Sequence, residues 1–232
     1  MDKDAGKRRS AEEAAKYVER GMTLGLGTGS TAAFLVDILG ERVAQGWPLR
    51  GIPTSEETRR QAERVGIEII EPDETTTIDL AIDGADEVDP GLNLIKGGGG
   101  ALLREKIVAN AARKFIVIAD KSKRVTALGA FPLPVEITPF GWALSVRAIR
   151  EALRMNGFEN AQLTLRARDG APLMTDGGNL IIDCALDRIE KPALLDAALS
   201  GIPGVVETGL FAGMADLVIF GDDNNVSIAK AA

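Results

Sequence analysis

Short apolar segments alternate with helix-patterned segments along the first 120 residues of the chain. The segments that predict strands are Met22–Leu26, Gly51–Pro53, Ile67–Ile70, Ile78–Ile82 and Phe115–Ala119. The segments that predict helices between them are Thr31–Val43, Thr54–Gly66 and Ala101–Ala112. Strands that alternate with helices in this way predict a parallel sheet with helices on both faces.

A helix signal precedes the first of these strands. Ser10-Ala-Glu-Glu13 has the spacing of a capping box, in which the Ser10 hydroxyl meets the Glu13 amide. This spacing predicts a first helix from about Ala11 to Glu19 that stops near Gly21.

The pattern changes near Leu128. The strands predicted beyond that point are Leu133–Thr138, Gln162–Arg166, Leu180–Cys184 and Val205–Glu207. Two predicted helices, Trp142–Met155 and Pro192–Leu199, complete the order β-α-β-β-α-β. That order is the one found in the ferredoxin-like split unit.

A last apolar segment, Asp216–Phe220, predicts a buried strand that returns to the first sheet. We therefore predict two domains with an interrupted boundary. Residues 1–128 and 207–232 form the parallel-sheet domain, and residues 129–206 form a small α+β domain inserted late in the chain.

Composition excludes several chemistries. The chain has no histidine and one cysteine, Cys184, which excludes a Ser-His-Asp triad, a His-ligated metal site, an intrachain disulfide and a multi-thiolate zinc site. Proton transfer therefore falls to Asp, Glu, Lys, Tyr or Cys side chains. Cys184 lies among apolar residues of a predicted strand, and we expect it to be a small buried core residue.

Charge and targeting signals indicate the compartment and the partners. The 27 basic and 34 acidic residues give a net charge of −7, which argues against a nucleic-acid partner and against an anionic membrane surface. The opening segment MDKDAGKRRS has no apolar signal segment, and no apolar run approaches the roughly 18 residues of a membrane span. A single cysteine fits a reducing compartment, so we expect a cytoplasmic protein.

The first of three glycine or acidic clusters is GLGTGSTA over Gly25–Ala32, between a predicted strand and a predicted helix. Ligands of open α/β sheets bind at the carboxyl ends of strands, and a helix N-terminus offers free N–H groups that suit a phosphate. The hydroxyls in this segment add donors. Two other interpretations stay open: a tight turn with capping residues, and a dinucleotide site, because Gly27–Ala32 fits G-x-G-x-x-A and Glu56 follows.

The second cluster is DGADEVD over Asp83–Asp89. Because the preceding strand ends near Asp83, we expect Asp83 and Asp86 at the carboxyl edge of the sheet. Carboxylates there can accept hydrogen bonds from sugar hydroxyls or move protons. The alternative is a set of solvated turn aspartates, which we favour only for Asp89.

The third cluster places Lys96 before four consecutive glycines, Gly97–Gly100, and a predicted helix. Such a run costs backbone entropy and makes sense where N–H groups line a cavity as an anion nest. Glu105, in the early turns of that helix, can face the same cavity. Together these groups suit proton abstraction next to a carbonyl, in which the carboxylate takes the proton and the donors stabilise an enediolate. The alternative is a flexible loop and a surface charge run, and we expect Arg104 and Lys106 to be surface charges.

Taken together, GLGTGSTA, DGADEVD and KGGGGALLREK resemble ribose-5-phosphate isomerase of type A. The segments FPLPVEITP, TDGGNLIIDC and IPGVVETGLFAGMADLVIFG resemble the same family, so the similarity spans about Lys7 to Gly221. The resemblance implies an aldose–ketose isomerase without a cofactor that interconverts D-ribose 5-phosphate and D-ribulose 5-phosphate through an enediolate, in the non-oxidative pentose phosphate pathway. It also implies an α/β fold with a Rossmann-like catalytic domain and an inserted ferredoxin-like α+β domain. The implied assembly is a homodimer, or a tetramer as in some members.

The resemblance implies roles for individual residues. Glu105 matches the general base that moves a proton between C2 and C1, and Asp83, with Asp86 beside it, matches a carboxylate of ring opening. Lys96 matches the cation that stabilises the enediolate. The positions that match substrate-binding residues are Lys7, Thr28, Gly29, Ser30, Thr31, Asp83, Gly84, Ala85, Asp86, Lys96, Gly97, Gly98, Gly99 and Lys123. Gly100 departs from the pattern, because family members often have alanine there.

Three other classes of function stay open. A non-catalytic sugar-phosphate sensor would need a DNA-binding segment, and the roughly 20 residues before the first predicted strand are too few for one. A nicotinamide-dependent oxidoreductase rests on the G-x-G-x-x-A string alone. A CoA transferase of similar architecture would use Glu105 as a nucleophile instead of a base.

Overall fold

The structure is a computed structural model that describes residues 3–231, and the chain in it divides into two compact units. The first unit comprises the chain up to Ala85, Arg104–Arg124 and the chain from Met214; the second comprises Asp86–Leu103 and Val125–Gly213. This division places residues 86–103 with the second unit, although the sequence patterns assign them to the first domain. The domain limits stay a prediction: residues 1–128 and 207–232 for the parallel-sheet domain, and residues 129–206 for the small α+β domain.

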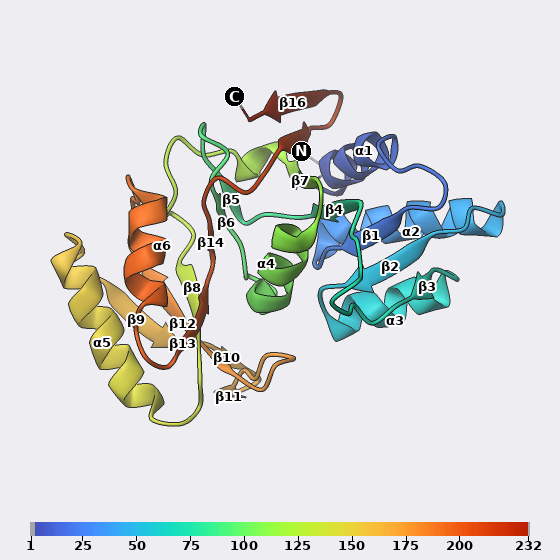
Figure 1. The fold of residues 1–232 in the computed structure, drawn as a ribbon. Coiled ribbons are helices and arrows are strands. Elements are labelled where there is room, and N and C mark those ends of the chain that lie inside the picture. Colours follow the sequence, from blue (N-terminus) through green and yellow to red (C-terminus); the bar gives the residue numbers. More distant parts are fainter. Residues whose placement is uncertain (1–2, 232) are drawn as a thin grey trace. The chain divides into compact units, whose positions relative to one another are not determined.

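A seven-stranded sheet forms the first unit, in the order β16-β15-β7-β4-β1-β2-β3 (Figure 1). Its strands are β1 (Thr23–Leu26), β2 (Arg50–Pro53), β3 (Glu68–Ile69), β4 (Leu80–Asp83), β7 (Phe115–Asp120), β15 (Leu217–Gly221) and β16 (Val226–Lys230). All neighbours pair in parallel except β15 with β16. Counted along the chain, the parallel strands have the order 3-2-1-4-5-6 of the Rossmann fold. The predicted α/β class is confirmed, and so is the return of the last apolar segment to this sheet as β15.

The helices of the first unit are α1 (Lys3–Ala15), α2 (Ser30–Ala44), α3 (Glu56–Arg64), α4 (Leu102–Ala111), whose first two residues are counted with the second unit, and the short 3₁₀ helix η1 (Lys121–Lys123). The core beneath them is formed by buried aliphatic side chains such as Leu24, Leu26, Ile82, Ile116 and Ile118. The sequence predicted the starts of α2 and α3 closely. Ser55 caps α3 by accepting a hydrogen bond from the Thr58 N–H at 3.1 Å.

The predicted capping box at Ser10 is wrong. Helix α1 begins at Lys3, and Ser10 is a buried interior residue whose hydroxyl donates to the Lys7 carbonyl at 2.8 Å. The physical reason is close packing: a Cβ on Gly6 would lie 2.8 Å from the Gly221 carbonyl oxygen of β15. Contact with the sheet therefore extends the helix toward its N-terminus, beyond what the local capping signal predicts.

The second unit contains a four-stranded antiparallel sheet in the order β13-β8-β12-β9. Its strands are β8 (Leu133–Ile137), β9 (Gln162–Leu165), β12 (Leu180–Ala185) and β13 (Val205–Thr208), and its helices are α5 (Trp142–Met155) and α6 (Pro192–Ser200). The two helices lie side by side (Figure 1). With the chain order β-α-β-β-α-β, this sheet is the predicted ferredoxin-like unit. Cys184 is fully buried in its core, as expected.

Several short strands of the second unit were not predicted. A three-stranded sheet contains β5 (Glu87–Val88), β6 (Leu94–Ile95) and β14 (Leu210–Phe211), and a hairpin contains β10 (Ala167–Arg168) and β11 (Ala171–Pro172). Strands of two residues are too short to show a hydrophobic period. Pairing of β6 with β14 explains why residues 86–103 belong to this unit.

Across residues 3–231, none of the helices combines the length and the apolar character needed to cross a membrane.

Candidate active site

The strand order of the first unit reverses between β1 and β4, which is where ligands bind in sheets of this kind. Asp83 is the last residue of β4 and is only 3% exposed. Its Oδ1 accepts hydrogen bonds from the Thr28 N–H at 3.0 Å and from the Gly84 N–H at 2.6 Å. The carboxylate is therefore fixed at the carboxyl edge of the sheet, where the sequence placed it.

Beside it, the GLGTGSTA segment leads into helix α2. Gly29 is the N-cap residue, with φ 102° and no side-chain cap, so the first N–H groups of this 15-residue helix have no capping side chain. Ser30 is exposed and Thr31 is half-buried, and neither hydroxyl bonds to another residue of the described range. This end of α2 has the features of an anion cradle.

Thr28 has a different environment from Ser30 and Thr31. Its hydroxyl lies 2.7 Å from that of Thr54 and 2.9 Å from that of Ser55, and its N–H donates to Asp83. The threonine therefore ties β1 to the start of α3 and holds the Asp83 carboxylate.

Two lysines predicted to bind substrate also belong to the first unit. Lys123 is half-buried in η1, directly after β7, so it lies at the same carboxyl edge of the sheet as Asp83. Lys7 is on α1, with 18% of its side chain exposed and its ammonium 3.1 Å from Asp4. Both are cations, as binding of an anion requires.

Glu105 lies in the first turn of α4 and is only 6% exposed. The adjacent Arg104 is a partly exposed surface charge, as expected, and its guanidinium donates to Glu56 at 2.8 Å. That hydrogen bond lowers the pKa of the Glu56 carboxyl. Glu56, the acidic residue of the dinucleotide interpretation, is therefore engaged by a protein cation.

In the second unit, Lys96 follows β6 and is 2% exposed. Its N–H donates to the Gly209 carbonyl at 2.9 Å, and its ammonium lies 5.5 Å from the centroid of the Phe211 ring. This arrangement is a cation–π contact with the charge removed from solvent. A buried ammonium interacts more strongly with a nearby negative charge than an ammonium in water does, because the effective dielectric constant is lower.

The glycine run after Lys96 is an ordered turn. The Gly100 N–H donates to the Gly97 carbonyl at 3.0 Å, and both residues have positive φ, 103° at Gly97 and 86° at Gly100. The Gly98 N–H donates to Asp86 Oδ2 at 2.7 Å. Within residues 3–231 the Gly99 N–H has no acceptor, so it remains able to donate to a ligand.

The structure also shows which acids of the acidic cluster have a structural role. Asp89 accepts hydrogen bonds from the N–H and the side-chain amide of Asn93, which confirms that it is a turn residue. Glu87, which the sequence patterns did not single out, is 4% exposed and accepts the N–H groups of Gly129 and Phe131, each at 2.7 Å. One glutamate in an acidic run gives no signal of such a role.

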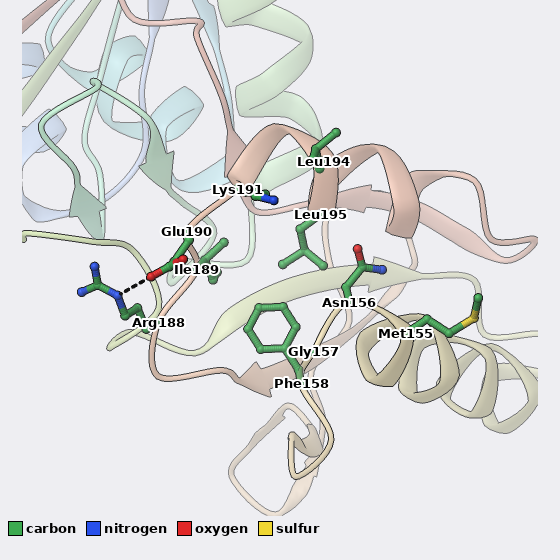
Figure 2. A pocket seen from close by; sticks show the side chains of 10 residues that line it. All are labelled: Met155, Asn156, Gly157, Phe158, Arg188, Ile189, Glu190, Lys191, Leu194 and Leu195. Atoms are coloured by element: carbon green, nitrogen blue, oxygen red, sulfur yellow. Dashed lines mark hydrogen bonds and ion pairs between the residues drawn. The ribbon is translucent and has the colours of Figure 1, made fainter.

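A cavity of about 480 Å³ in the second unit contains none of the predicted site residues (Figure 2). Its lining combines apolar side chains, among them Phe158 and Leu195, with an ion pair between Arg188 and Glu190 at 3.2 Å. In the described part of the chain, no group of three or more Cys, Asp or Glu side chains is arranged to hold a metal ion.

The fold and the residues at its switch point define an α/β protein of Rossmann topology with acidic, basic and hydroxyl groups at the carboxyl edge of its sheet. Residues 50–225 match the family model described as ribose 5-phosphate isomerase A (phosphoriboisomerase A). Ribose-5-phosphate isomerase A of Nitrobacter hamburgensis is 50% identical over 230 residues, covering 99% of each chain. That of Rhodopseudomonas palustris strain TIE-1 is 53% identical over 233 residues, covering both chains completely.

Solved structures agree with these relatives. A D-ribose-5-phosphate isomerase in complex with phospho-erythronic acid is 41% identical, with a TM-score of 0.91, over 99% of this chain and 100% of that one. The ribose 5-phosphate isomerase A of Methanocaldococcus jannaschii has a TM-score of 0.90 at 40% identity, with the same coverage. The chain belongs to the ribose 5-phosphate isomerase A family. It is an isomerase that interconverts ribose 5-phosphate and ribulose 5-phosphate in the pentose phosphate pathway.

Proposed function

We propose that Glu105 is the base of this isomerisation and that it acts with Asp83, Lys96 and the N–H groups of Gly97–Gly99. The observation that carries the proposal is the burial of the Glu105 carboxyl, 6% exposed, in the helix that directly follows the ordered glycine turn. Burial removes a carboxylate from competing water, and a positioned base contributes about 10²–10⁴-fold to proton transfer.

The first chemical step is opening of the furanose ring. Opening moves the proton of the C1 hydroxyl to the ring oxygen, breaks the bond from C1 to that oxygen and leaves an aldehyde at C1. Asp83 accepts and returns this proton, with Asp86 assisting. Two N–H groups hold Asp83 Oδ1, so the carboxylate meets the sugar in one orientation.

The second step is proton transfer between carbons. Glu105 removes the C2 proton, the electron pair moves to O1, and a cis-enediolate forms. The ammonium of Lys96 and the glycine N–H groups stabilise the negative charge on oxygen. The O2 hydroxyl then gives its proton to O1, the electron pair on O2 forms the C2 carbonyl, and Glu105 returns the first proton to C1. This leaves a ketone at C2 and a hydroxyl at C1.

The phosphate is assigned to the N-terminus of α2. Its N–H groups from Gly29 onward, the Ser30 and Thr31 hydroxyls and the lysines Lys7 and Lys123 supply donors and positive charge. Local cations are needed because the net charge of −7 repels an anion at long range.

We also propose a cytoplasmic location and a homodimer. The single cysteine supports the location, and the resemblance supports the homodimer. The assembly is tested by light scattering of the purified chain across concentration. A mass of one chain, 24.5 kDa, at all concentrations contradicts the homodimer.

The test of the site is turnover of ribose 5-phosphate, followed by ketose absorbance, with excess EDTA and no nicotinamide. We expect Glu105→Gln to keep sugar-phosphate binding and to lose at least about 10²-fold in turnover. Glu57→Gln is the matched control, because Glu57 is an exposed glutamate in the first turn of α3. Near-normal turnover of Glu105→Gln removes Glu105 from the role of base, and acyl-CoA turnover that depends on Glu105 would instead indicate a nucleophile.

A further inference from the structure

The side chain of Arg166 connects two parts of the second unit. Its Nη1 donates to the Gly97 carbonyl oxygen at 2.6 Å and to the Gly98 carbonyl oxygen at 3.3 Å. Its Nε donates to Asp183 Oδ2 at 2.9 Å, and its Nη2 donates to Asp183 Oδ1. The guanidinium is therefore a bidentate partner of one carboxylate and a donor to two successive carbonyl groups of the glycine turn.

These two carbonyl groups determine where two N–H groups point. The Gly97 carbonyl shares a peptide plane with the Gly98 N–H, and the Gly98 carbonyl shares one with the Gly99 N–H. In a trans peptide the C=O and N–H bonds point in opposite directions. Glycine has no Cβ to restrict its backbone, so external contacts must select one orientation. Arg166 supplies such contacts on the carbonyl side of both planes.

Asp86 holds one of the same planes from its other side, by accepting the Gly98 N–H at 2.7 Å. The Gly99 N–H makes no bond to another described residue. The Gly99 N–H is thus a donor whose direction is set by Arg166 and which can donate to a ligand. A cation at the carbonyl end of a peptide group also polarises it and strengthens the N–H as a donor.

Arg166 is itself rigidly held. Its N–H donates to the Ile181 carbonyl at 2.9 Å, and its carbonyl accepts the Leu173 N–H at 2.9 Å. Its side chain is 12% exposed and that of Asp183 is 23% exposed, so both charges are largely removed from water. Replacement of a buried ion pair by apolar groups is often neutral for stability, which makes stability alone a weak reason for this pair.

We propose that Arg166, oriented by Asp183, is a positioning residue of the isomerisation. It fixes the two peptide planes of the glycine turn and so directs the Gly99 N–H group to meet the negative charge that forms on the enediolate, while Asp86 accepts the Gly98 N–H. This inference rests on the proposed function of the Gly97–Gly99 turn as the donor of those hydrogen bonds.

The experiment compares Arg166→Met and Arg166→Lys with the parent chain. Arg168→Met is the matched control, because Arg168 is exposed on the adjacent hairpin strand β10. Four quantities are measured: kcat, KM for ribose 5-phosphate, the Kd of phospho-erythronic acid, and hydrogen exchange of the peptide that spans residues 96–101. Phospho-erythronic acid is a suitable probe because its planar carboxylate resembles an enediolate more than it resembles an aldehyde.

Loss of one direct oxyanion donor costs about 10²–10³-fold in kcat. Because Arg166 acts through the backbone, we expect about a 10–100-fold loss of kcat in Arg166→Met, with KM changed less than about threefold. The Kd of phospho-erythronic acid should rise by a similar factor, and exchange of the turn should become faster. Arg166→Lys, which keeps the charge but not the fork, should lie between Arg166→Met and the parent. Arg168→Met should match the parent.

The outcomes separate the two ideas. Faster exchange of the turn with an unchanged kcat and analogue Kd refutes the proposed function of the glycine turn, and the catalytic role of Arg166 with it. If both the exchange of the turn and kcat are unchanged, the positioning role of Arg166 is refuted, and the proposed function of the glycine turn is not affected. If Arg166→Met fails to fold, Arg166→Lys and Asp183→Asn carry the same test, and parent-like values in both overturn the proposal.

Discussion

Gly27 offers a test of how tightly the backbone and the Asp83 carboxylate are matched. A Cβ on Gly27 would lie 2.2 Å from Asp83 Oδ1, 2.4 Å from its Cγ and 2.5 Å from its Cα. The Gly27 backbone lies outside the left-handed region, so Gly27→Ala introduces a steric conflict without conformational strain. Rotation of the Asp83 side chain relieves the first two contacts but not the third, because the Cα belongs to β4.

The expected magnitude follows from these contacts. Overpacking in a close-packed region costs about 1–3 kcal/mol. Displacement of the carboxylate also breaks its hydrogen bond from the Thr28 N–H, and a bond to a charged group is worth about 1.5–3 kcal/mol. We expect a loss of about 4 kcal/mol in the free energy of unfolding, or roughly 8–16 °C in Tm for a chain of this size. Turnover per folded molecule should fall by at least about 10²-fold, because the carboxylate assigned to ring opening is misplaced.

Thermal unfolding and isomerase turnover measure the two effects separately. Gly51→Ala is the control, because its Cβ would meet Leu26 Cδ1 at 2.5 Å, the far end of a flexible side chain, and none of its three nearest contacts is with Asp83. This control should lose stability and keep the parent turnover per folded molecule. If Gly27→Ala melts within about 2 °C of the parent, or keeps more than about a tenth of its turnover, then the close contact with Asp83 does not have the importance argued here.

Three further outcomes are expected. Gly100→Ala places a side chain at φ 86°, so we expect a loss of about 1–2 kcal/mol, measured by urea unfolding, with turnover within a few-fold of the parent. Glu87→Gln should cost about 2 kcal/mol by the same measurement, because an amide cannot accept both the Gly129 and the Phe131 N–H, and turnover per folded molecule should be retained. Burial raises the pKa of the Cys184 thiol from an ordinary 9.0 to about 12, so only the unfolded thiol ionises as the pH rises above 9. Stability should therefore fall between pH 9 and 12, and Cys184→Ala should have a shallower fall in urea unfolding across that window; an identical slope in both contradicts the assignment.

Much of the architecture could be predicted because long elements have clear periods and end signals. The apolar spacing over Trp142–Met155 predicts helix α5 with the limits that the structure has. Prolines and glycines at the ends of β8 and α6 added further limits. The short strands β5, β6 and β14 could not be predicted, because each has only two residues and because β6 pairs with β14, which lies more than 100 positions later in the chain.

The site was predictable to a different degree. Sequence reasoning identified which residue types follow strands and begin helices, and this places Asp83 and Gly29 correctly on the sheet edge. It could not identify Arg166, which lies between β9 and β10 with no neighbouring motif. The contact that makes Arg166 notable joins it to Gly97, 69 positions earlier, and only the folded chain shows it.

The acidic cluster shows why membership of a recognisable motif does not by itself identify a residue as catalytic. Each of its four acids, Asp83, Asp86, Glu87 and Asp89, accepts at least one backbone N–H group. Each substitution to an amide therefore changes a backbone contact as well as a charge. Loss of turnover in Asp86→Asn, for example, has two possible causes. One is the loss of a proton acceptor, and the other is rotation of the peptide plane that contains the Gly98 N–H. The two causes are separable, because a turned plane also raises the Kd of phospho-erythronic acid and the exchange of the glycine turn, whereas a lost proton acceptor leaves both unchanged.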